Sequence, residues 1–214
     1  MTRRRIKDAL SAPSNQLTQQ DRTMKTAHIA TALILLPSVA LAHTGSRSLD
    51  GLATGILHPL SGIDHLAAMI AVGILGVTQG GRAVWQFPLT FVCMMVSGAL
   101  MAGAGLPLMA VEPAIVLSAI VLGTMIMTSL QFRTAIGLSI IGLFALFHGH
   151  AHGTEGVSGT GWTTFVIGFV FATAALHLAG IACAVAARGY AVTFRRSAGL
   201  VIAGAGALVG AGLI

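Results

Sequence analysis

Charged side chains are scarce in this chain of 214 residues, where Asp, Glu, Lys and Arg together make up only 8%. Soluble domains carry about 25% charged residues, so this composition excludes a soluble globular fold. Cysteine is also rare, and Cys93 and Cys183 each stand alone within apolar sequence. They are predicted to be small packing residues rather than metal ligands or a disulfide pair. The phosphate-binding pattern G-x-x-x-x-G-K-[ST] is missing, so ATP hydrolysis is not indicated.

What the chain has instead is long apolar sequence. Hydrophobic residues make up 55% of it and the mean hydropathy is +0.87, as expected of a polytopic membrane protein. Six apolar segments are each near the ~20 residues that cross a bilayer as a helix, and none alternates as a strand does. We therefore predict an all-α bundle of about six transmembrane helices surrounded by lipid. The segments are 51–77, 84–104, 111–130, 134–150, 162–187 and 196–214.

Residues 24–42 have the three parts of a secretory signal peptide. Lys25 gives a short positive region, residues 29–36 are apolar, and the chain then reaches an A-x-A cleavage site ending at Ala42. The alternative is an uncleaved first transmembrane helix, but the apolar run is too short and ends at Pro37. We therefore predict cleavage after Ala42.

Residues 1–23 are polar and basic, which is unusual ahead of a signal peptide. We interpret them as an extension from a mis-assigned start codon, with translation beginning at Met24. The transmembrane domain then comprises residues 43–214, whose six basic and four acidic residues leave a net charge of only +2. Because most of the full charge of +6 belongs to the leader, nucleic-acid binding is not indicated.

The arginines predict the orientation of the bundle. A cleaved signal peptide places the new N-terminus at His43 on the periplasmic side of a bacterial inner membrane, so the first segment runs inward. Loops 78–83, 131–133 and 188–195 are then cytoplasmic and carry four arginines. The external loops 105–110 and 151–161 carry no Lys or Arg, in agreement with the positive-inside rule.

Three histidines and a glutamate lie at the end of the fourth apolar segment, in the stretch LFHGHAHGTE. Ionisable side chains are costly in hydrocarbon, so their presence indicates a function. His148, His152 and Glu155 follow the i, i+4, i+7 spacing that places side chains on one face of a helix. His150 points elsewhere, or the two glycines of this stretch loosen the helix there.

The first segment carries a second polar group within HPLSGIDH, formed by His58, Asp64 and His65. On a regular helix His58 and His65 would lie about 10 Å apart, too far for one ion to bridge. Pro59 and Gly62 can open the helix between them and shorten this distance. Asp64 can accept a hydrogen bond from a histidine or bind an ion directly.

The predicted orientation brings both polar groups to the outer ends of their helices, where water can reach them. Imidazole and carboxylate ligands together suit Ni²⁺, Co²⁺, Zn²⁺ or Fe²⁺, so the groups predict a metal or proton site. His177 lies alone near mid-depth and is predicted to be an interhelical hydrogen-bond partner. Met94, Met95, Met101, Met125 and Met127 are predicted to fill the core.

Cleavage after Ala42 would also expose a free α-amine on His43. The amine and the imidazole of one residue can chelate a metal as a pair. The tail HTGSRSLDG is short and can fold back over the outer side of the bundle. We interpret it as a candidate capture arm, and the alternative is that His43 merely follows a processing site.

The two motifs carry a resemblance. HPLSGIDH (58–65) resembles the H-P-x-x-G-x-D-H signature of the HupE/UreJ family, and FHGHAHGTE (147–155) resembles its F-H-G-x-A-H-G-x-E signature. Every fixed position of both signatures is matched, and the leader and multi-span layout also agree, so the resemblance covers 24–214. It implies that the functional residues are His58, Asp64, His65, His148, His152 and Glu155. His150, at a variable position of the second signature, and His43 complete our set of candidate metal ligands.

The resemblance implies that residues 43–214 are a permease that imports Ni²⁺ or Co²⁺ across the inner membrane for hydrogenase or urease maturation. The ion is then the transported substrate, and no prosthetic group is implied. A divalent cation moving inward gains about 4.6 kcal/mol per 100 mV of membrane potential. The alternative is an intramembrane metalloenzyme, with His148 and His152 as ligands and Glu155 or Asp64 as base. The glutamate that follows the first histidine in H-E-x-x-H is missing here.

Overall fold

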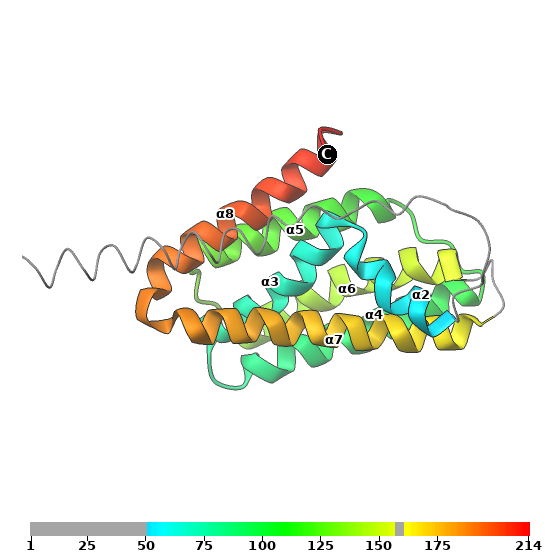
Figure 1. Cartoon of the computed structure of the whole chain (residues 1–214), viewed down its shortest axis with the longest axis horizontal. Helices are drawn as coiled ribbons and strands as arrows, with labels where there is room; N and C mark the ends of the chain where they lie inside the picture. Colours follow the sequence, from blue (N-terminus) through cyan, green and yellow to red (C-terminus); the bar gives the residue numbers. More distant parts are fainter. Residues whose placement is uncertain (1–50, 157–160) are drawn as a thin grey trace, which may run out of the picture. The chain divides into compact units, whose positions relative to one another are not determined.

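A computed structural model of the chain describes residues 51–156 and 161–214, with the backbone alone at 155 and 156. The predicted extension 1–23, the signal peptide 24–42 and His43 lie outside the described residues. Within them the chain is helical and contains no strand, which confirms the all-α prediction (Figure 1). The helices are α2 (Gly51–Leu57), η1 (His58–Leu60), α3 (Ile63–Gln79), α4 (Ala83–Gly103), α5 (Val111–Thr128), α6 (Thr134–Gly156), α7 (Trp162–Ala186), η2 (Ala187–Tyr190) and α8 (Ala191–Gly210).

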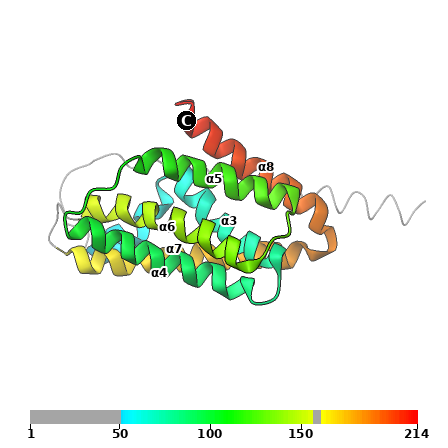
Figure 2. The same cartoon turned by 180° about the vertical axis from the view of Figure 1, so that it is seen from behind.

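Four helical stretches of the described chain are long and apolar enough to cross a membrane, and a fifth arises if the bent pair α2–η1 and α3 is one span. The last stretch, Trp162–Gly210, has 49 residues. A straight helix of that length would measure about 74 Å, more than twice the ~30 Å hydrocarbon core. The chain instead turns back at η2, so that α7 and α8 are separate helices (Figures 1 and 2).

Two predicted helix boundaries are wrong: the end of the fourth apolar segment and the start of the last one. The fourth segment was expected to end at residue 150, but α6 runs unbroken to Gly156. The glycines of the HGHAHG stretch therefore do not loosen the helix. The last segment was expected to begin at residue 196, but α8 begins at Ala191 and includes Arg195 and Arg196. Their long side chains can reach the helix end from inside the first turns, so charge alone did not mark the boundary.

The first segment is broken where the sequence predicted. Pro59 lies at the start of η1, and Gly62 adopts an extended conformation with φ −104° and ψ 123° before α3 begins. The two helical parts meet at 82°. The carbonyl of His58 is satisfied by the backbone N–H of Ser61 at 3.0 Å and by its hydroxyl at 2.6 Å. The break thus loses little hydrogen bonding inside the bundle.

Small residues allow the helices to approach closely. On α4, a Cβ atom at Gly98 would meet the carbonyl of Leu146, and on α6 a Cβ at Gly149 would meet the carbonyl of Met95. The glycine-rich α8 packs closely on α5 in the same way. Bundles in lipid depend on this type of contact because lipid tails are as apolar as the side chains. α3 and α2 pack mainly against α7 (Figures 1 and 2).

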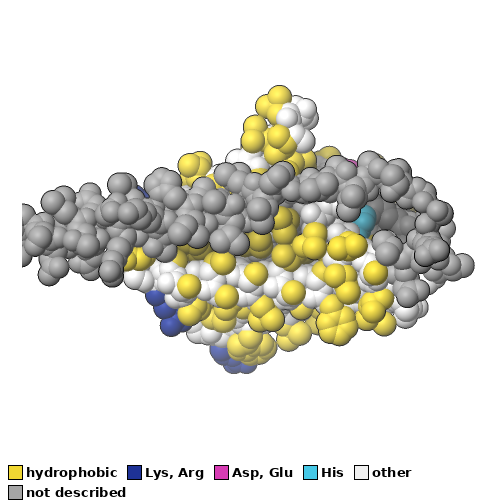
Figure 3. All heavy atoms as spheres, viewed as in Figure 1, with side chains coloured by type: hydrophobic (Ala, Val, Ile, Leu, Met, Phe, Trp, Pro, Cys, Tyr) yellow, Lys and Arg dark blue, Asp and Glu magenta, His cyan; other side chains and the backbone are white. Residues whose placement is uncertain are grey.

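The face of the described helices drawn in Figure 3 carries many hydrophobic side chains. Large side chains such as Leu100, Phe171 and Leu178 are exposed on these helices, as expected for a surface in contact with lipid. Cys93 and Cys183 are free and also exposed, so the prediction that they pack inside the bundle is wrong. In lipid the outside of a helix is as apolar as the core, and hydrophobicity alone does not tell one face from the other.

The two ends of the described bundle differ in charge. At one end α3 finishes, α4 and α6 begin, and α7 turns into α8 (Figures 1 and 2). Polar side chains join these elements, because Gln79 and Gln131 donate to the Leu130 and Thr78 carbonyls and Arg195 donates to Ser129. We call this the arginine end, and the opposite end, where α4 and α6 finish and α7 begins, the histidine end. The arginine end carries Arg82, Arg133, Arg188, Arg195 and Arg196.

Candidate metal-binding site

The helix break brings the two histidine motifs into contact. The His152 ring lies 4.7 Å from the His58 ring and 4.5 Å from the His65 ring, measured between centroids. A regular helix would hold His58 and His65 about 10 Å apart, but here both rings contact the ring of His152. His65 also approaches His148, at 5.2 Å between ring centroids. We call His58, Asp64, His65, His148 and His152 the histidine cluster.

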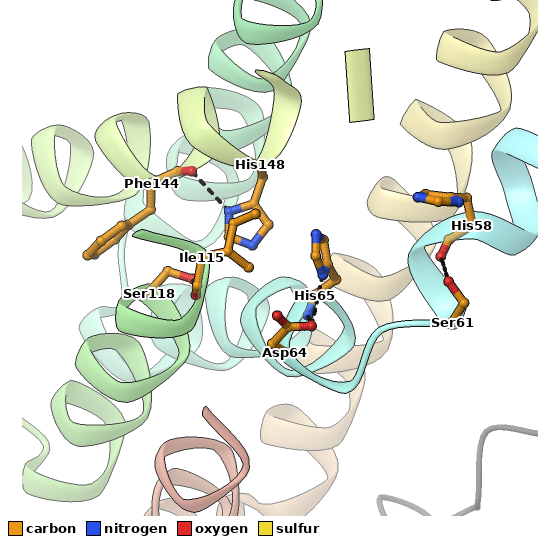
Figure 4. A network of polar contacts seen from close by, with 8 residues as sticks. All are labelled: His58, Ser61, Asp64, His65, Ile115, Ser118, Phe144 and His148. Atoms are coloured by element: carbon orange, nitrogen blue, oxygen red, sulfur yellow. Dashed lines mark hydrogen bonds and ion pairs between the residues drawn. The ribbon is translucent and has the colours of Figure 1, made fainter. Parts of the chain in front are cut away.

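Asp64 orients His65. Its Oδ1 atom lies 2.9 Å from the Nδ1 atom of His65 and also accepts the backbone N–H of that residue at 2.9 Å (Figure 4). Asp64 sits in the first turn of α3, where the helix dipole stabilises a negative charge. Because a carboxylate oxygen accepts, Nδ1 is the donor in this contact, and a neutral ring keeps its lone pair on Nε2. The Nε2 atom is buried and has no hydrogen-bond partner among the described residues.

His148 is oriented in a similar way from α6. Its Nδ1 atom donates to the Phe144 carbonyl one turn earlier at 2.9 Å (Figure 4). The side chain is fully buried, with 0% exposure, and its Nε2 atom has no hydrogen-bond partner within the described chain. Histidines that bind metals usually donate the other ring N–H to a carboxylate or a backbone carbonyl. His65 has a carboxylate partner in Asp64, and His148 has a backbone carbonyl partner in Phe144.

Aromatic residues of α7 cover the cluster, and the sequence reasoning missed them. Phe169 contacts the His152 ring at 4.2 Å, and Phe165 contacts the His58 ring at 5.6 Å. Phe91 of α4 packs on His148 at 5.5 Å. Phe165 and Phe169 are four residues apart on α7. This spacing was visible in the sequence, but ordinary core positions of a helix have the same spacing.

Ser118 of α5 is a further polar residue that the sequence did not single out. It is buried and donates its hydroxyl hydrogen to the Ile115 carbonyl at 2.6 Å. Figure 4 shows it on the side of α5 that faces Asp64 and His148. The lone pairs of the hydroxyl oxygen remain available to a cation or a water molecule in the cluster.

Other candidate residues are not part of the cluster. His150 lies on the opposite side of α6, where its Nε2 atom donates to the Leu106 carbonyl at 2.8 Å. The side chain of Glu155 and the whole of His43 lie outside the described residues. His177 is buried, but neither ring nitrogen has a hydrogen-bond partner in the described chain, so the predicted interhelical hydrogen bond is wrong. An unsatisfied buried polar group costs about 1–3 kcal/mol, so His177 requires another explanation.

The cluster is partly buried and is not preorganised for a metal ion. Asp64, His148 and His152 are buried, whereas His58 and His65 are partly exposed. Across residues 51–156 and 161–214, no three His, Cys, Asp or Glu side chains are arranged to hold a metal ion as they stand. Ligand nitrogens would have to lie about 2.0–2.1 Å from a shared ion, whereas these rings pack edge to face. Binding therefore requires the rings to rotate toward a common point.

We expect Gly62→Ala to impair metal capture while leaving the fold intact. A Cβ atom at Gly62 would lie 2.8 Å from Nδ1 of His65 and 3.0 Å from Oδ1 of Asp64, so it would separate the pair. Loss of such an outer-shell contact typically weakens metal binding about 10- to 100-fold. Uptake assays should show a higher KM with a normal amount of protein in the membrane. Gly204→Ala is the matched control, since nothing lies within 4 Å of a Cβ there. Equal KM values for the two variants would contradict the positioning role of Asp64.

Comparisons with known proteins agree with the two motifs. The profile of the family described as HupE / UreJ protein matches residues 31–209. The chain is also similar to Protein HupE of Rhizobium leguminosarum bv. viciae, with 42% identity over 192 residues. This match covers 87% of the chain and 100% of the relative. No solved structure matches the chain.

Proposed function

Since the chain belongs to the HupE/UreJ family, we propose that it is a secondary permease that imports Ni²⁺, and to some extent Co²⁺, for hydrogenase or urease maturation. The family is one of metal permeases with a role in nickel and cobalt uptake. The transported ion is the substrate, and the driving force is the membrane potential. A divalent cation gains about 4.6 kcal/mol per 100 mV when it moves inward.

The observation that carries this proposal is the hydrogen bonding of the imidazole nitrogens of His65 and His148. In His65 and His148 the Nδ1 atom is bound to an oxygen, and the Nε2 atom is buried without a hydrogen-bond partner in the described chain. Burying an unsatisfied nitrogen is unfavourable, so two of them within one cluster indicate a ligand that binds there. Imidazole nitrogen suits Ni²⁺ and neighbouring transition metals, and the Asp64 carboxylate would offset part of the positive charge.

The broken helix provides a plausible route to binding. His58 precedes the break and His65 follows it, so small rotations about Gly62 change the distance between their rings. A hydrated ion that reaches the histidine end would exchange water for His58 and His152 first, and then for His65 and His148. Broken helices at mid-membrane binding sites serve the same purpose in other secondary transporters.

The proposed ligand set is His58, Asp64, His65, His148 and His152. Glu155 remains a proposed ligand from its spacing in the sequence, and His43 remains a proposed capture residue. We propose that His150 instead anchors the α4–α5 loop through the Leu106 carbonyl. Its nitrogen then fixes the position of α6 relative to α4, which holds His148 and His152 in place.

We also propose a bacterial inner-membrane location, six spans and a periplasmic mature N-terminus after cleavage at Ala42. Five arginines share the arginine end, as the positive-inside rule requires of a cytoplasmic face.

We expect Met109→Cys to react with an impermeant thiol reagent from outside, and Gln131→Cys only after permeabilisation. Both changes belong in a background without Cys93 and Cys183, which are exposed. The reverse pattern would contradict the orientation.

The function is tested by uptake of radioactive nickel into proteoliposomes that contain the purified chain. We expect uptake that depends on an inside-negative potential, that cobalt inhibits, and that zinc inhibits more weakly. Empty liposomes and liposomes without a potential are the controls. Nickel entry no faster than in empty liposomes, with the protein correctly inserted, would refute the permease function.

A further inference from the structure

His177 is the buried polar side chain that the histidine cluster does not explain. It is 1% exposed and both of its ring nitrogens lack a hydrogen-bond partner in the described chain. It lies on α7, and α7 presents one face to the interior through residues four apart. Phe165 and Phe169 of this face contact His58 and His152, so the next two residues of the face lie further toward the arginine end. These two residues are Thr173 and His177.

Thr173 has unusual neighbours. Its hydroxyl oxygen lies 3.5 Å from the sulfur of Met69 and 3.6 Å from the sulfur of Met95. All three side chains are buried, with at most 1% exposure. Thioether sulfur is a weak hydrogen-bond acceptor, so the hydroxyl gains little from this contact. Valine in place of Thr173 and leucine in place of Met69 and Met95 would fill the same space without a buried hydroxyl group. Packing alone therefore does not explain why these three residues are threonine and methionine.

Three helices bring these groups together. Met95 and Phe91 are one turn apart on α4, and the Phe91 ring contacts the His177 ring at 5.1 Å. On α3, the turn after Met69 passes so close to α7 that a Cβ at Gly73 would meet the His177 carbonyl. His177 therefore lies one turn from Thr173 on the face where α3, α4 and α7 converge. We call Met69, Met95, Thr173 and His177 the Met–His cluster.

We propose that the Met–His cluster is a second, weaker binding site for the transported ion, deeper in the bundle than the histidine cluster. This inference rests on the proposed permease function. An imidazole nitrogen with two thioether sulfurs and a hydroxyl oxygen is a neutral and relatively soft ligand set. Weak ligands suit an ion in transit, because conduction requires binding that allows both entry and release.

The position of the cluster fits this role. His152 is four residues from the end of α6, or about 6 Å, whereas His177 is nine residues from the opposite end of α7, or about 14 Å. Contacting rings connect the two regions in the order His152, His65, His148, Phe91 and His177. An ion released by His148 would thus find its next buried lone pairs at the Met–His cluster. Softer ligands there also favour nickel and cobalt over magnesium and calcium, which prefer oxygen.

Two variants remove the ligands and preserve volume. His177→Phe keeps an aromatic ring against Phe91 and removes both nitrogens. The double variant Met69→Leu/Met95→Leu removes both sulfurs, and methionine and leucine exchange at little cost in packing. Met94→Leu is the matched control, because Met94 lies beside Met95 on α4 but packs toward Gly142 of α6.

The first measurement is Co²⁺ binding to the purified chain, followed by absorption spectroscopy. We expect His177→Phe and the double variant each to bind one ion fewer than the wild type, and the double variant to lose the sulfur-to-cobalt band. Met94→Leu should match the wild type in both. If the double variant binds as many ions as Met94→Leu with the same spectrum, the second site does not exist, whatever the uptake rates are.

The second measurement separates this inference from the permease function. With radioactive nickel we expect the variants to lower Vmax by about tenfold or more, with little change in KM, since losing even an outer-shell partner of a ligand has an effect of that order. Variants of the histidine cluster should instead raise KM. Failure of the wild type to take up metal would refute the permease function, while the binding measurement would still decide the second site. Wild-type uptake by both variants would refute a role of the Met–His cluster in transport and leave the permease function standing.

Discussion

His65→Ala and His148→Ala are each expected to reduce nickel uptake at least about 100-fold, which exceeds the ~10- to 100-fold loss typical of removing only an outer-shell partner. Each variant removes a buried Nε2 atom whose ring is already oriented by Asp64 or by the Phe144 carbonyl.

The measurement is the initial rate of uptake in membranes that contain equal amounts of folded protein. His148 is fully buried, so His148→Leu should accompany the alanine variant to show that a cavity is not the cause. Leu143→Ala is the matched control on the same helix, since its side chain is 55% exposed and is not part of the cluster. Near-normal uptake by His65→Ala and His148→Ala would rule out the proposed ligand set.

Gly149→Ala should damage the protein more than any other single methyl group added to α6. A Cβ atom at this position would overlap the backbone carbonyl of Met95, so α4 and α6 would have to separate. Overpacking of this type costs typically about 1–3 kcal/mol. A domain of this size then loses about 2–4 °C in Tm for each kcal/mol. Uptake should fall as well, because His148 and His152 move with α6 and a binding site tolerates only small displacements.

Gly142→Ala on the same helix is the control for this prediction. A Cβ atom there would meet only flexible side-chain atoms, with Met94 at 3.3 Å and Thr90 at 3.5 Å. We expect it to retain both Tm and uptake. Thermal unfolding in detergent and uptake in liposomes should be measured on both variants. Equal Tm values would show that the α4–α6 crossing can relax, and that the glycine in this motif serves another purpose.

The helix break illustrates what could be predicted from the sequence. Pro59 and Gly62 identified the place where the first segment opens, because proline lacks an N–H and glycine tolerates a bend. The consequence for function could not be predicted, since it depends on the direction of the bend. An angle of 82° places His58 and His65 on either side of His152, and no spacing rule contains that angle.

The Met–His cluster illustrates the opposite case. Met69, Met95 and His177 belong to three helices and are separated by long stretches of sequence. In the sequence, Met95 was predicted to be core filler and His177 a single hydrogen-bond partner, and nothing singled out Met69. Only the packing of α3, α4 and α7 brings their side chains to one place, and helix periodicity carries no information about which helices become neighbours.

The sequence alone determined that this chain is a helical membrane protein, because scarce charge and long apolar segments leave helices as the way to satisfy the backbone in lipid. It also predicted which ionisable residues carry function, because such groups are too costly to keep in apolar segments without a role. The tertiary structure decided how these residues are arranged. It showed which nitrogens are oriented and unsatisfied within the described chain, turned His150 away from His148, and buried Asp64, His148 and His152. Those properties depend on how the helices pack, which is set by contacts between residues far apart in the chain.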